Sequence, residues 1–490
     1  MLKFVHRPLI RALKFAGFTV LGGIVAIIAV AVFYLNSLSD LEPWHTVHLD
    51  EDYTAGGAVS SFTDYLAMED RLFAELQDEL ISKLSFGPKD EVNRFQPDSV
   101  SNPLTWPRNW NRSFLFETES PTVSVLLLHG MSDSPYSLRE IGQSLHEGGA
   151  NVLGLRLPGH GTAPAGLLET KAEDMISATA LAAKHLKAMQ PDKPLFAVGY
   201  SNGGALSVVH ALRQLEDPSL AKIDRIILLS PAIGVTPAAA YAPIAIQLGH
   251  ILGVQRLAWS SLGPEYDPYK YTSFAINAGY VTHQLTMEIR SRMDTATADG
   301  SVAALPPILG FSSAVDATVI TRDMISNLYA KLPENGSELF LFDTNQFLTR
   351  RPLLSDDAAD FLDPLVTDTA RTYTLRVITN ETPSDRKTVL NTYVPGTNEP
   401  AVQRLDLSWP PGVFSLAHIS LPFSAEDPLY GIIPQPEISR LQLGALALRG
   451  ERGISEIPAG DMLRMRWNPF YSIMLSETQR FLDLTVQRRD

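Results

Sequence analysis

A serine between two glycines is the residue whose surroundings point most clearly to chemistry. Residues 199–203 read Gly-Tyr-Ser-Asn-Gly, with Ser201 at the centre. An apolar run of strand length precedes this segment, and an apolar run of helix length follows it. In such a strand–turn–helix the glycines permit a very tight turn, and the serine hydroxyl is presented at the end of the strand. We therefore predict that Ser201 is a nucleophile; the alternative is an ordinary strand–helix turn.

A serine nucleophile needs a base to take its proton and a carboxylate to orient that base. After a serine placed in this way, the acid and then the histidine are expected further along the chain. Asp316 follows the apolar run 308–311 and a turn of small residues, so we predict that it is the acid. Its alternative role is to cap the next helix. Asp343, at the end of the following apolar run, is the reserve candidate.

Three histidines lie well beyond Ser201 in the chain: His250, His283 and His418. The first two precede Asp316, which is the wrong order for a base. His418 follows it and is the predicted base. The competing interpretation is a buried core histidine, because His418 lies in an apolar stretch.

The reaction also needs backbone N–H groups that bind the oxyanion, each contributing about 100- to 1000-fold in rate. One predicted donor is the amide of Asn202, directly after the nucleophile. The other is the amide of Met131, in the turn that follows the apolar run 123–128. We expect His129, in the same turn, to shape the loop rather than to transfer protons.

Apolar runs of strand length alternate with segments of helix length from residue 123 onward. This alternation predicts a mostly parallel sheet covered by helices on both faces. The predicted strands are 123–128, 151–155, 195–198, 226–229, 308–311 and 339–342, and the predicted helices include 137–146, 172–189 and 203–215.

Several motifs occur in an order that resembles the α/β-hydrolase superfamily, in the branch of monoacylglycerol lipases, carboxylesterases and serine aminopeptidases. They are His129-Gly-Met-Ser-Asp-Ser-Pro-Tyr, Leu157-Pro-Gly-His-Gly-Thr162, Gly199-Tyr-Ser-Asn-Gly203, the Asp316 loop and the His418 loop. The resemblance covers residues 123–229 and 306–342, the His418 loop and a C-terminal helix over 471–484. It implies a Ser201–Asp316–His418 triad with Met131 and Asn202 at the oxyanion. Two departures are Ser313, where many relatives have glycine, and the long interval between acid and base.

Two stretches interrupt the alternation within a hydrolase domain predicted over 111–490. Residues 232–305 fall where relatives carry a cap over the pocket, and residues 344–413 look like an inserted subdomain. The apolar character of the cap predicts an acyl-binding site, or alternatively only packing of the cap onto the core. Residues 36–110 are interpreted as a juxtamembrane segment, with one amphipathic helix over 61–84.

Residues 15–35 carry no charge, and a helix of this length can cross a bilayer. Basic residues precede this stretch, at positions Lys3, Arg7, Arg11 and Lys14, and acidic residues follow it. The positive-inside bias predicts a single-pass anchor with a cytoplasmic N-terminus and the catalytic domain on the opposite side of the membrane. A cleaved signal peptide is the alternative.

The 490 residues carry a formal net charge of −14 and no cysteine. The acidic balance argues against a nucleic-acid partner, and the absence of cysteine excludes disulfides and thiol chemistry. We predict a membrane-anchored serine hydrolase that cleaves carboxylic esters, including lipid-like ones, and requires no metal or other cofactor. The alternatives are an acyltransferase or aminopeptidase with the same triad, or a catalytically silent membrane-tethered interaction module; the oligomeric state is left open.

Overall fold

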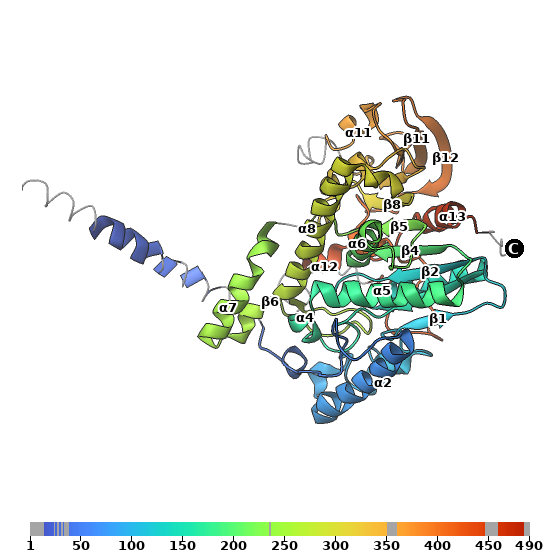
Figure 1. The fold of residues 1–490 in the computed structure, drawn as a ribbon. Coiled ribbons are helices and arrows are strands. Elements are labelled where there is room, and N and C mark those ends of the chain that lie inside the picture. Colours follow the sequence, from blue (N-terminus) through green and yellow to red (C-terminus); the bar gives the residue numbers. More distant parts are fainter. Residues whose placement is uncertain are drawn as a thin grey trace, which may run out of the picture.

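A ten-stranded central sheet organises the chain in this computed structural model (Figure 1). The structure describes residues 14–23, 25–26, 29–30, 33, 39–234, 237–349, 360–445 and 459–484. The strands, in their order across the sheet, are β1 (Phe114–Phe116), β3 (Ala150–Leu155), β2 (Val123–Leu128), β4 (Leu195–Tyr200), β5 (Arg225–Leu229), β8 (Ile308–Ser313), β9 (Glu338–Phe342), β10 (Thr374–Asn380), β11 (Lys387–Tyr393) and β12 (Ala401–Ser408).

The strands from β3 to β10 run parallel to one another, and β1, β11 and β12 add antiparallel pairs at the two edges. This confirms the predicted mostly parallel sheet. All the strands predicted from apolar runs are present, and their observed bounds differ from the predicted ones by two residues at most. Buried parallel strands are apolar on both faces, which is why continuous apolar runs marked them so clearly.

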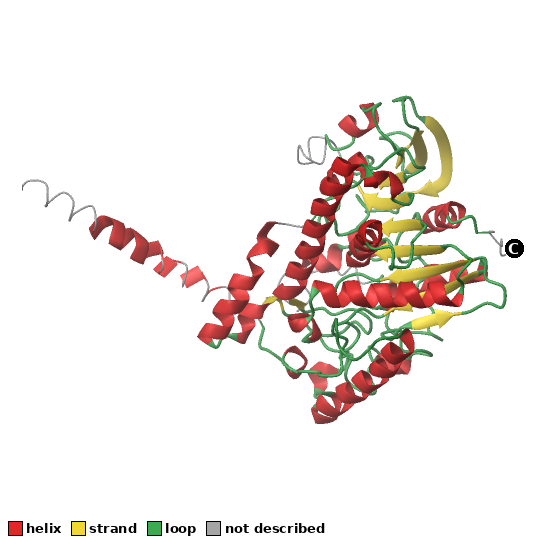
Figure 2. Ribbon diagram, viewed as in Figure 1, coloured by secondary structure: helices red, strands yellow, loops and turns green. Residues whose placement is uncertain are grey.

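Helices cover both faces of the sheet (Figure 2). The longer helices are α2 (Phe62–Glu79), α3 (Arg139–Glu147), α5 (Ala172–Met189), α6 (Asn202–Glu216), α7 (Ala242–Leu252), α8 (Ile276–Asp299) and α13 (Tyr471–Phe481). Side chains of β2 alternate between two cores: Leu126 and Leu128 pack with α5, α6 and α8, whereas Val125 and Leu127 pack with α3 and α13. The period of two along a strand therefore divides the apolar residues between two helical layers.

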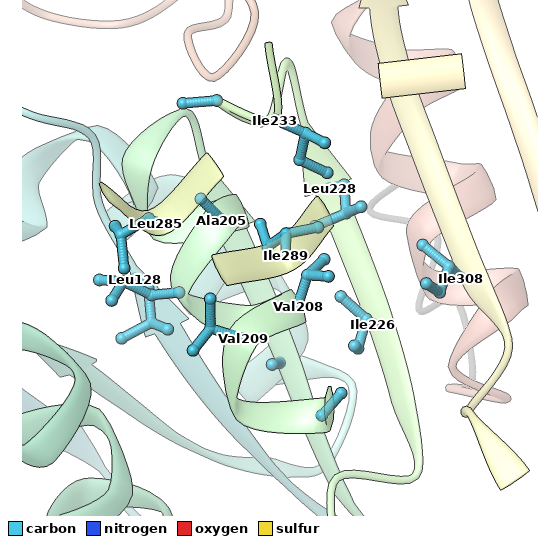
Figure 3. Close-up of a cluster of buried hydrophobic side chains, with 14 of the residues drawn as sticks. Leu128, Ala205, Val208, Val209, Ile226, Leu228, Ile233, Leu285, Ile289 and Ile308 are labelled. Atoms are coloured by element: carbon cyan, nitrogen blue, oxygen red, sulfur yellow. The ribbon is translucent and has the colours of Figure 1, made fainter. Parts of the chain in front are cut away.

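Helix α6, which begins directly after Ser201, lies in the centre of one of these cores (Figure 3). Its Ala205, Val208 and Val209 are buried between the sheet and helix α8. The labelled partners from the sheet are Leu128 on β2, Ile226 and Leu228 on β5, and Ile308 on β8. The other labelled partners are Leu285 and Ile289 on α8, together with Ile233 in the loop after β5. Burial of each large aliphatic side chain contributes about 1.5–3 kcal/mol, so the position of the α6 N-terminus is strongly fixed.

The stretch 344–413 extends the central sheet. Strand β10 joins β9 in parallel, and β11 and β12 follow as antiparallel strands at that edge. The turn between β11 and β12 contains Gly396 with a φ of 86°. The stretch predicted as an inserted subdomain thus contributes strands to the same sheet that carries the hydrolase motifs.

The segment before β1 also packs onto the sheet. Helix α2 begins after Ser61, whose side chain accepts a hydrogen bond from the Asp64 amide, and it contributes Tyr65 and Leu72 to the core on the α5 side. Arg156, fully buried after β3, forms ion pairs with Asp52 and Glu69. These buried contacts join residues 39–110 to the rest of the domain.

Among the helices in the described part of the chain, none combines the length and apolar character needed to cross a membrane. The predicted anchor over residues 15–35 lies partly outside the described residues, and residues 1–13 lie wholly outside them.

Candidate active site

Ser201 occupies a strained turn between β4 and α6. Its backbone has φ 53° and ψ −115°, an unusual conformation for a residue with a side chain. The Ser201 N–H donates to the Leu229 carbonyl at 2.9 Å, and the Ser201 carbonyl accepts from Gly204 and Ala205. Such a conformation costs on the order of 1–3 kcal/mol and persists only where the surrounding structure enforces it. The structure thus places Ser201 on the tight strand-to-helix turn that the sequence predicted.

The glycines around Ser201 are required by close backbone contacts. A Cβ on Gly203 would lie 1.9 Å from the Leu128 carbonyl oxygen, and one on Gly199 would lie 2.4 Å from the Gly203 carbonyl oxygen. Neither position can hold a larger side chain unless the backbone moves. The steric reasoning from the Gly-Tyr-Ser-Asn-Gly motif is therefore confirmed in atomic terms.

Asp316 and His418 form a hydrogen-bonded pair although 102 residues separate them. The distance from His418 Nδ1 to Asp316 Oδ2 is 2.8 Å, and both side chains are almost completely buried. The other carboxylate oxygen, Oδ1, accepts from the backbone N–H groups of Thr318 and Val319 at 2.8 and 3.1 Å. Burial alone raises the pKa of Asp316, but attraction to His418 and these hydrogen bonds outweigh it and lower the pKa below its usual value. The carboxylate is thus kept ionised, and in the neutral ring the Nδ1 proton lies toward Asp316.

Ser201 and His418 line the same cavity, which has a volume of about 490 Å³. Gly130 and Met131 line it too, so the turn after β2 and the turn after β4 meet at this cavity. The structure describes no hydrogen bond between Ser201 and His418; catalytic hydrogen bonds often tighten only when a substrate is bound. Asn202 is fully buried as the first residue of α6, where a backbone N–H has no acceptor within its own helix.

Two other sequence candidates have structural partners of their own. Asp343, the reserve acid, accepts hydrogen bonds from Thr379 Oγ1 at 2.7 Å and Gln346 Nε2 at 3.0 Å. His129 Nε2 accepts from the Leu157 N–H at 3.0 Å, and its Nδ1 lies 2.9 Å from the Gly130 carbonyl oxygen. Asp316 rather than Asp343 is therefore the carboxylate beside His418, and His129 fixes the loop, as expected.

His160 contributes to the same loop, a role that the sequence alone did not indicate. Its Nε2 accepts the Ser132 N–H at 3.1 Å, while its Nδ1 lies 2.9 Å from the Pro158 carbonyl oxygen. Burial lowers the pKa of His160 to about 4, so the ring is neutral and can accept. Ser132 has a φ of 61°, and His160 helps to hold this strained residue directly after Met131. The motif containing His160 was visible in the sequence, but its contact with Ser132 depends on the folded loops.

A buried ion pair fixes the chain that follows His418. Asp427 accepts from Arg139 Nη2 at 2.8 Å and from the Tyr136 hydroxyl at 3.0 Å. Tyr136 and Arg139 follow the Met131 turn, so these contacts tie the His418 loop to the opposite side of the cavity. Within the described ranges, no group of three or more His, Asp or Glu side chains is arranged to hold a metal ion.

Residues 119–344 match the model of a family described as "Serine aminopeptidase, S33". Over these residues the chain is similar to that family, in agreement with the resemblance of its motifs to this branch of the α/β-hydrolases. No curated protein matches the chain.

Several solved structures resemble part of the chain at low identity. A monoglyceride lipase from Saccharomyces cerevisiae, a soluble variant in complex with a substrate analog, is 15% identical, with 47% of this chain and 81% of that chain covered and a TM-score of 0.37. A structure of the metagenome-derived lipolytic enzymes LipS and LipT gives 19% identity, coverage of 48% and 88%, and a TM-score of 0.36. A thermostable carboxyl esterase from Bacillus coagulans gives 15% identity, coverage of 47% and 83%, and a TM-score of 0.35.

Proposed function

We propose that the protein is a serine hydrolase that cleaves carboxylic esters through an acyl-enzyme on Ser201. His418 is the base, Asp316 orients it, and the backbone amides of Met131 and Asn202 bind the oxyanion. The observation that carries this proposal is the Asp316–His418 hydrogen bond beside a cavity that Ser201 also lines. A buried imidazole with a carboxylate on Nδ1 has its Nε2 lone pair available to a serine hydroxyl.

In the proposed reaction, His418 Nε2 takes the Ser201 proton as Ser201 Oγ attacks the ester carbonyl. The carbonyl oxygen becomes an oxyanion held by the Met131 and Asn202 amides, and the partial positive charge at the start of α6 stabilises it further. His418 then donates its proton to the departing alcohol, which leaves an acyl group on Ser201. Water attacks this acyl group, with His418 again taking a proton, and the released acid restores Ser201.

The wall of the cavity supports an ester with an apolar acyl part. Met131, Phe274, Val319, Ile419 and Phe423 line it beside Ser201, and Phe274 belongs to the stretch predicted as a cap. A peptide substrate is the second candidate, because the matching family is described by an aminopeptidase. The two are separated by comparing hydrolysis of 4-nitrophenyl butyrate with hydrolysis of aminoacyl 4-nitroanilides.

We also propose that residues 15–35 anchor the protein in a membrane, with the catalytic domain on the side opposite the N-terminus. The support is the uncharged stretch and the basic residues that precede it. The test is extraction of membranes containing the full chain with alkaline carbonate. An anchored chain stays in the pellet, and a chain lacking residues 1–38 is released; recovery of the full chain in the supernatant contradicts the anchor.

The direct test of the proposed chemistry is labelling with a fluorophosphonate probe, which reacts with activated serines. We expect the wild type to be labelled, Ser201→Ala to be unlabelled and His418→Ala to be labelled very slowly. Ser219→Ala, an exposed serine beyond the end of α6, serves as the matched control and should label like the wild type. Equal labelling of the wild type and Ser201→Ala would refute the assignment.

A further inference from the structure

Three cationic side chains line the cavity that contains Ser201: Lys270, Arg464 and Arg466. Lys270 comes from the stretch between β5 and α8, whereas the two arginines follow helix α12 (Ala459–Leu463). In the part of the chain that the structure describes, no carboxylate lies within ion-pair distance of any of them. Cations enclosed in a protein wall are normally paired, because the loss of hydration is costly.

Two of these cations are held close to the catalytic groups. Lys270 precedes Tyr271, whose N–H donates to the Ser132 carbonyl at 2.8 Å, so Lys270 lies beside the turn that contains Met131. Arg464 Nη2 donates to Thr318 Oγ1 at 2.9 Å, and the Thr318 N–H binds the Asp316 carboxylate. The positive charges therefore flank the catalytic centre on the oxyanion side and on the acid side.

The acidic groups in the same wall are either satisfied or lie at its rim. Asp267 accepts from the Tyr430 hydroxyl at 2.6 Å and from the Lys270 backbone N–H at 3.1 Å. Burial raises the pKa of Asp133 to about 7 and lowers the pKa of Lys270 below its usual value, while the attraction between these two groups opposes both shifts. Asp461 is exposed on α12. Arg464 and Arg466, which have no carboxylate partner among the described residues, therefore leave the cavity with more unsatisfied positive charge than unsatisfied negative charge.

The guanidinium groups retain donors for a ligand. An arginine side chain has five N–H donors. In the described residues, Arg464 uses one of its groups on Thr318, and Arg466 uses one on the Tyr266 hydroxyl at 3.3 Å. A carboxylate or phosphate group is the chemistry that matches such donors, because its oxygens accept from several of them at once.

We propose that the ester substrate carries an anionic group, a carboxylate or a phosphate, which Lys270, Arg464 and Arg466 bind while Ser201 attacks the ester carbonyl. This inference rests on the proposed function and adds the substrate class. The apolar residues of the wall then hold the uncharged part of the same molecule. A small ester with one charged end fits a cavity of about 490 Å³ better than a long uncharged lipid.

The test compares pairs of esters that differ only in charge, using the full chain. One pair is 4-nitrophenyl hydrogen glutarate and its methyl ester, which examines a carboxylate. The other is 1-butyrylglycerol 3-phosphate and 1-butyrylglycerol, which examines a phosphate. We expect kcat/KM for the anionic member of at least one pair to exceed that for the neutral member about ten- to a hundredfold, the range of charge-assisted hydrogen bonds. The pair with the larger ratio identifies the anion.

Charge-removing variants test whether the three side chains produce this preference. We expect Lys270→Gln, Arg464→Gln and Arg466→Gln each to lower the anionic-to-neutral ratio severalfold or more, and Arg464→Lys to retain more of it than Arg464→Gln. Arg404→Gln, on the exposed strand β12, is the matched control and should keep the wild-type ratio. The ratio corrects for any general disturbance of the fold, since both esters meet the same active site.

The possible outcomes separate this inference from the proposed function. A wild type that hydrolyses the neutral esters as well as the anionic ones, with ratios unchanged in the variants, overturns the anionic site and leaves the serine hydrolase intact. A protein that hydrolyses none of the esters and does not react with the fluorophosphonate probe overturns both. An anionic preference that survives all three substitutions also overturns the assignment to these residues.

Discussion

The two sides of the cavity that Ser201 and His418 line are built in different ways. On one side, Ser201 is held by neighbours in sequence: strand β4, two glycines with no room for a Cβ, and the first turn of α6. On the other side, Asp316 and His418 are 102 residues apart and meet only because the chain between them adds four strands, β9 to β12, to the sheet and then returns to the cavity.

This difference shows which parts of such a site can be recognised from a short segment of sequence. The geometry at Ser201 is a property of a short segment and the backbone around it, so a motif identifies it. The position of His418 depends on long-range contacts such as the Arg139–Asp427 ion pair.

The largest expected effect concerns the acid. Replacing Asp316 with Asn removes the charge that orients His418 and stabilises its protonated form, so we expect kcat to fall about 10⁴-fold. Asp343→Asn is the matched control, because that carboxylate binds Thr379 and Gln346, and its kcat should stay within about threefold of the wild type. Steady-state hydrolysis of 4-nitrophenyl butyrate measures both. A large fall in kcat for Asp343→Asn, with little change for Asp316→Asn, would show that Asp343 is the catalytic carboxylate.

The next largest effect is expected on stability, from a substitution in the tight turn around Ser201. In Gly203→Ala the new Cβ would collide with the Leu128 carbonyl, so we expect a loss of about 3 kcal/mol or more in the free energy of unfolding. Gly279→Ala, within α8, meets no atom within 4 Å and should be neutral or stabilise by about 0.5–1 kcal/mol. Denaturant unfolding measures both values. Equal stability of the two variants would contradict the steric account of the turn.

A smaller effect is expected from His160, which supports the oxyanion turn. His160→Ala leaves the Ser132 N–H without its acceptor and loosens the turn that follows Met131, so we predict a 10- to 100-fold fall in kcat, within the range of a weakened oxyanion donor. His210→Ala removes another buried histidine, which lies on α6 and has its Nε2 2.8 Å from the carbonyl oxygen of Ala221. That variant should lose stability yet keep its kcat. A comparable fall in kcat in both variants would show that the loss of activity follows from removing any buried histidine, rather than from the contact between His160 and Ser132.

The smallest expected effect is a change with pH. The pKa of Asp133 is raised to about 7 in the folded protein by burial, so its contribution to stability is present near pH 4 and is lost as the pH rises through about 7. Asp133→Asn does not titrate. The melting temperature of the wild type relative to this variant should therefore fall by a few degrees between these pH values. A difference that stays constant with pH would show that Asp133 keeps an ordinary pKa.

The sequence predicted the elements that depend on local patterns. The bounds of β2 and α5 agree with the structure to the residue, and the helix after Ser201 differs by one residue at each end. These segments are buried and strongly apolar, with glycine or polar residues at their ends. Asp316 was chosen from its place in the chain order and from its position after a predicted strand, and the structure brings it to His418.

The features that escaped prediction arise from contacts between distant segments. His160 acts on Ser132 only after two loops fold against each other. The buried Arg156 attaches the segment around Asp52 and Glu69 to the domain, and nothing near Arg156 in the sequence indicates those partners. Likewise, Lys270 and Arg464 line one cavity only because two distant segments, the stretch 232–305 and the residues after α12, fold against the same site.

If Ser201 is the activated nucleophile, a reagent that modifies activated serines must form its covalent adduct on this residue. The purified full chain is reacted with a fluorophosphonate, digested, and examined by mass spectrometry to locate the adduct. We expect one modified residue, Ser201, and strongly slowed modification in His418→Ala. An adduct on a different serine, or equal rates of modification with and without the His418 imidazole, would contradict this expectation.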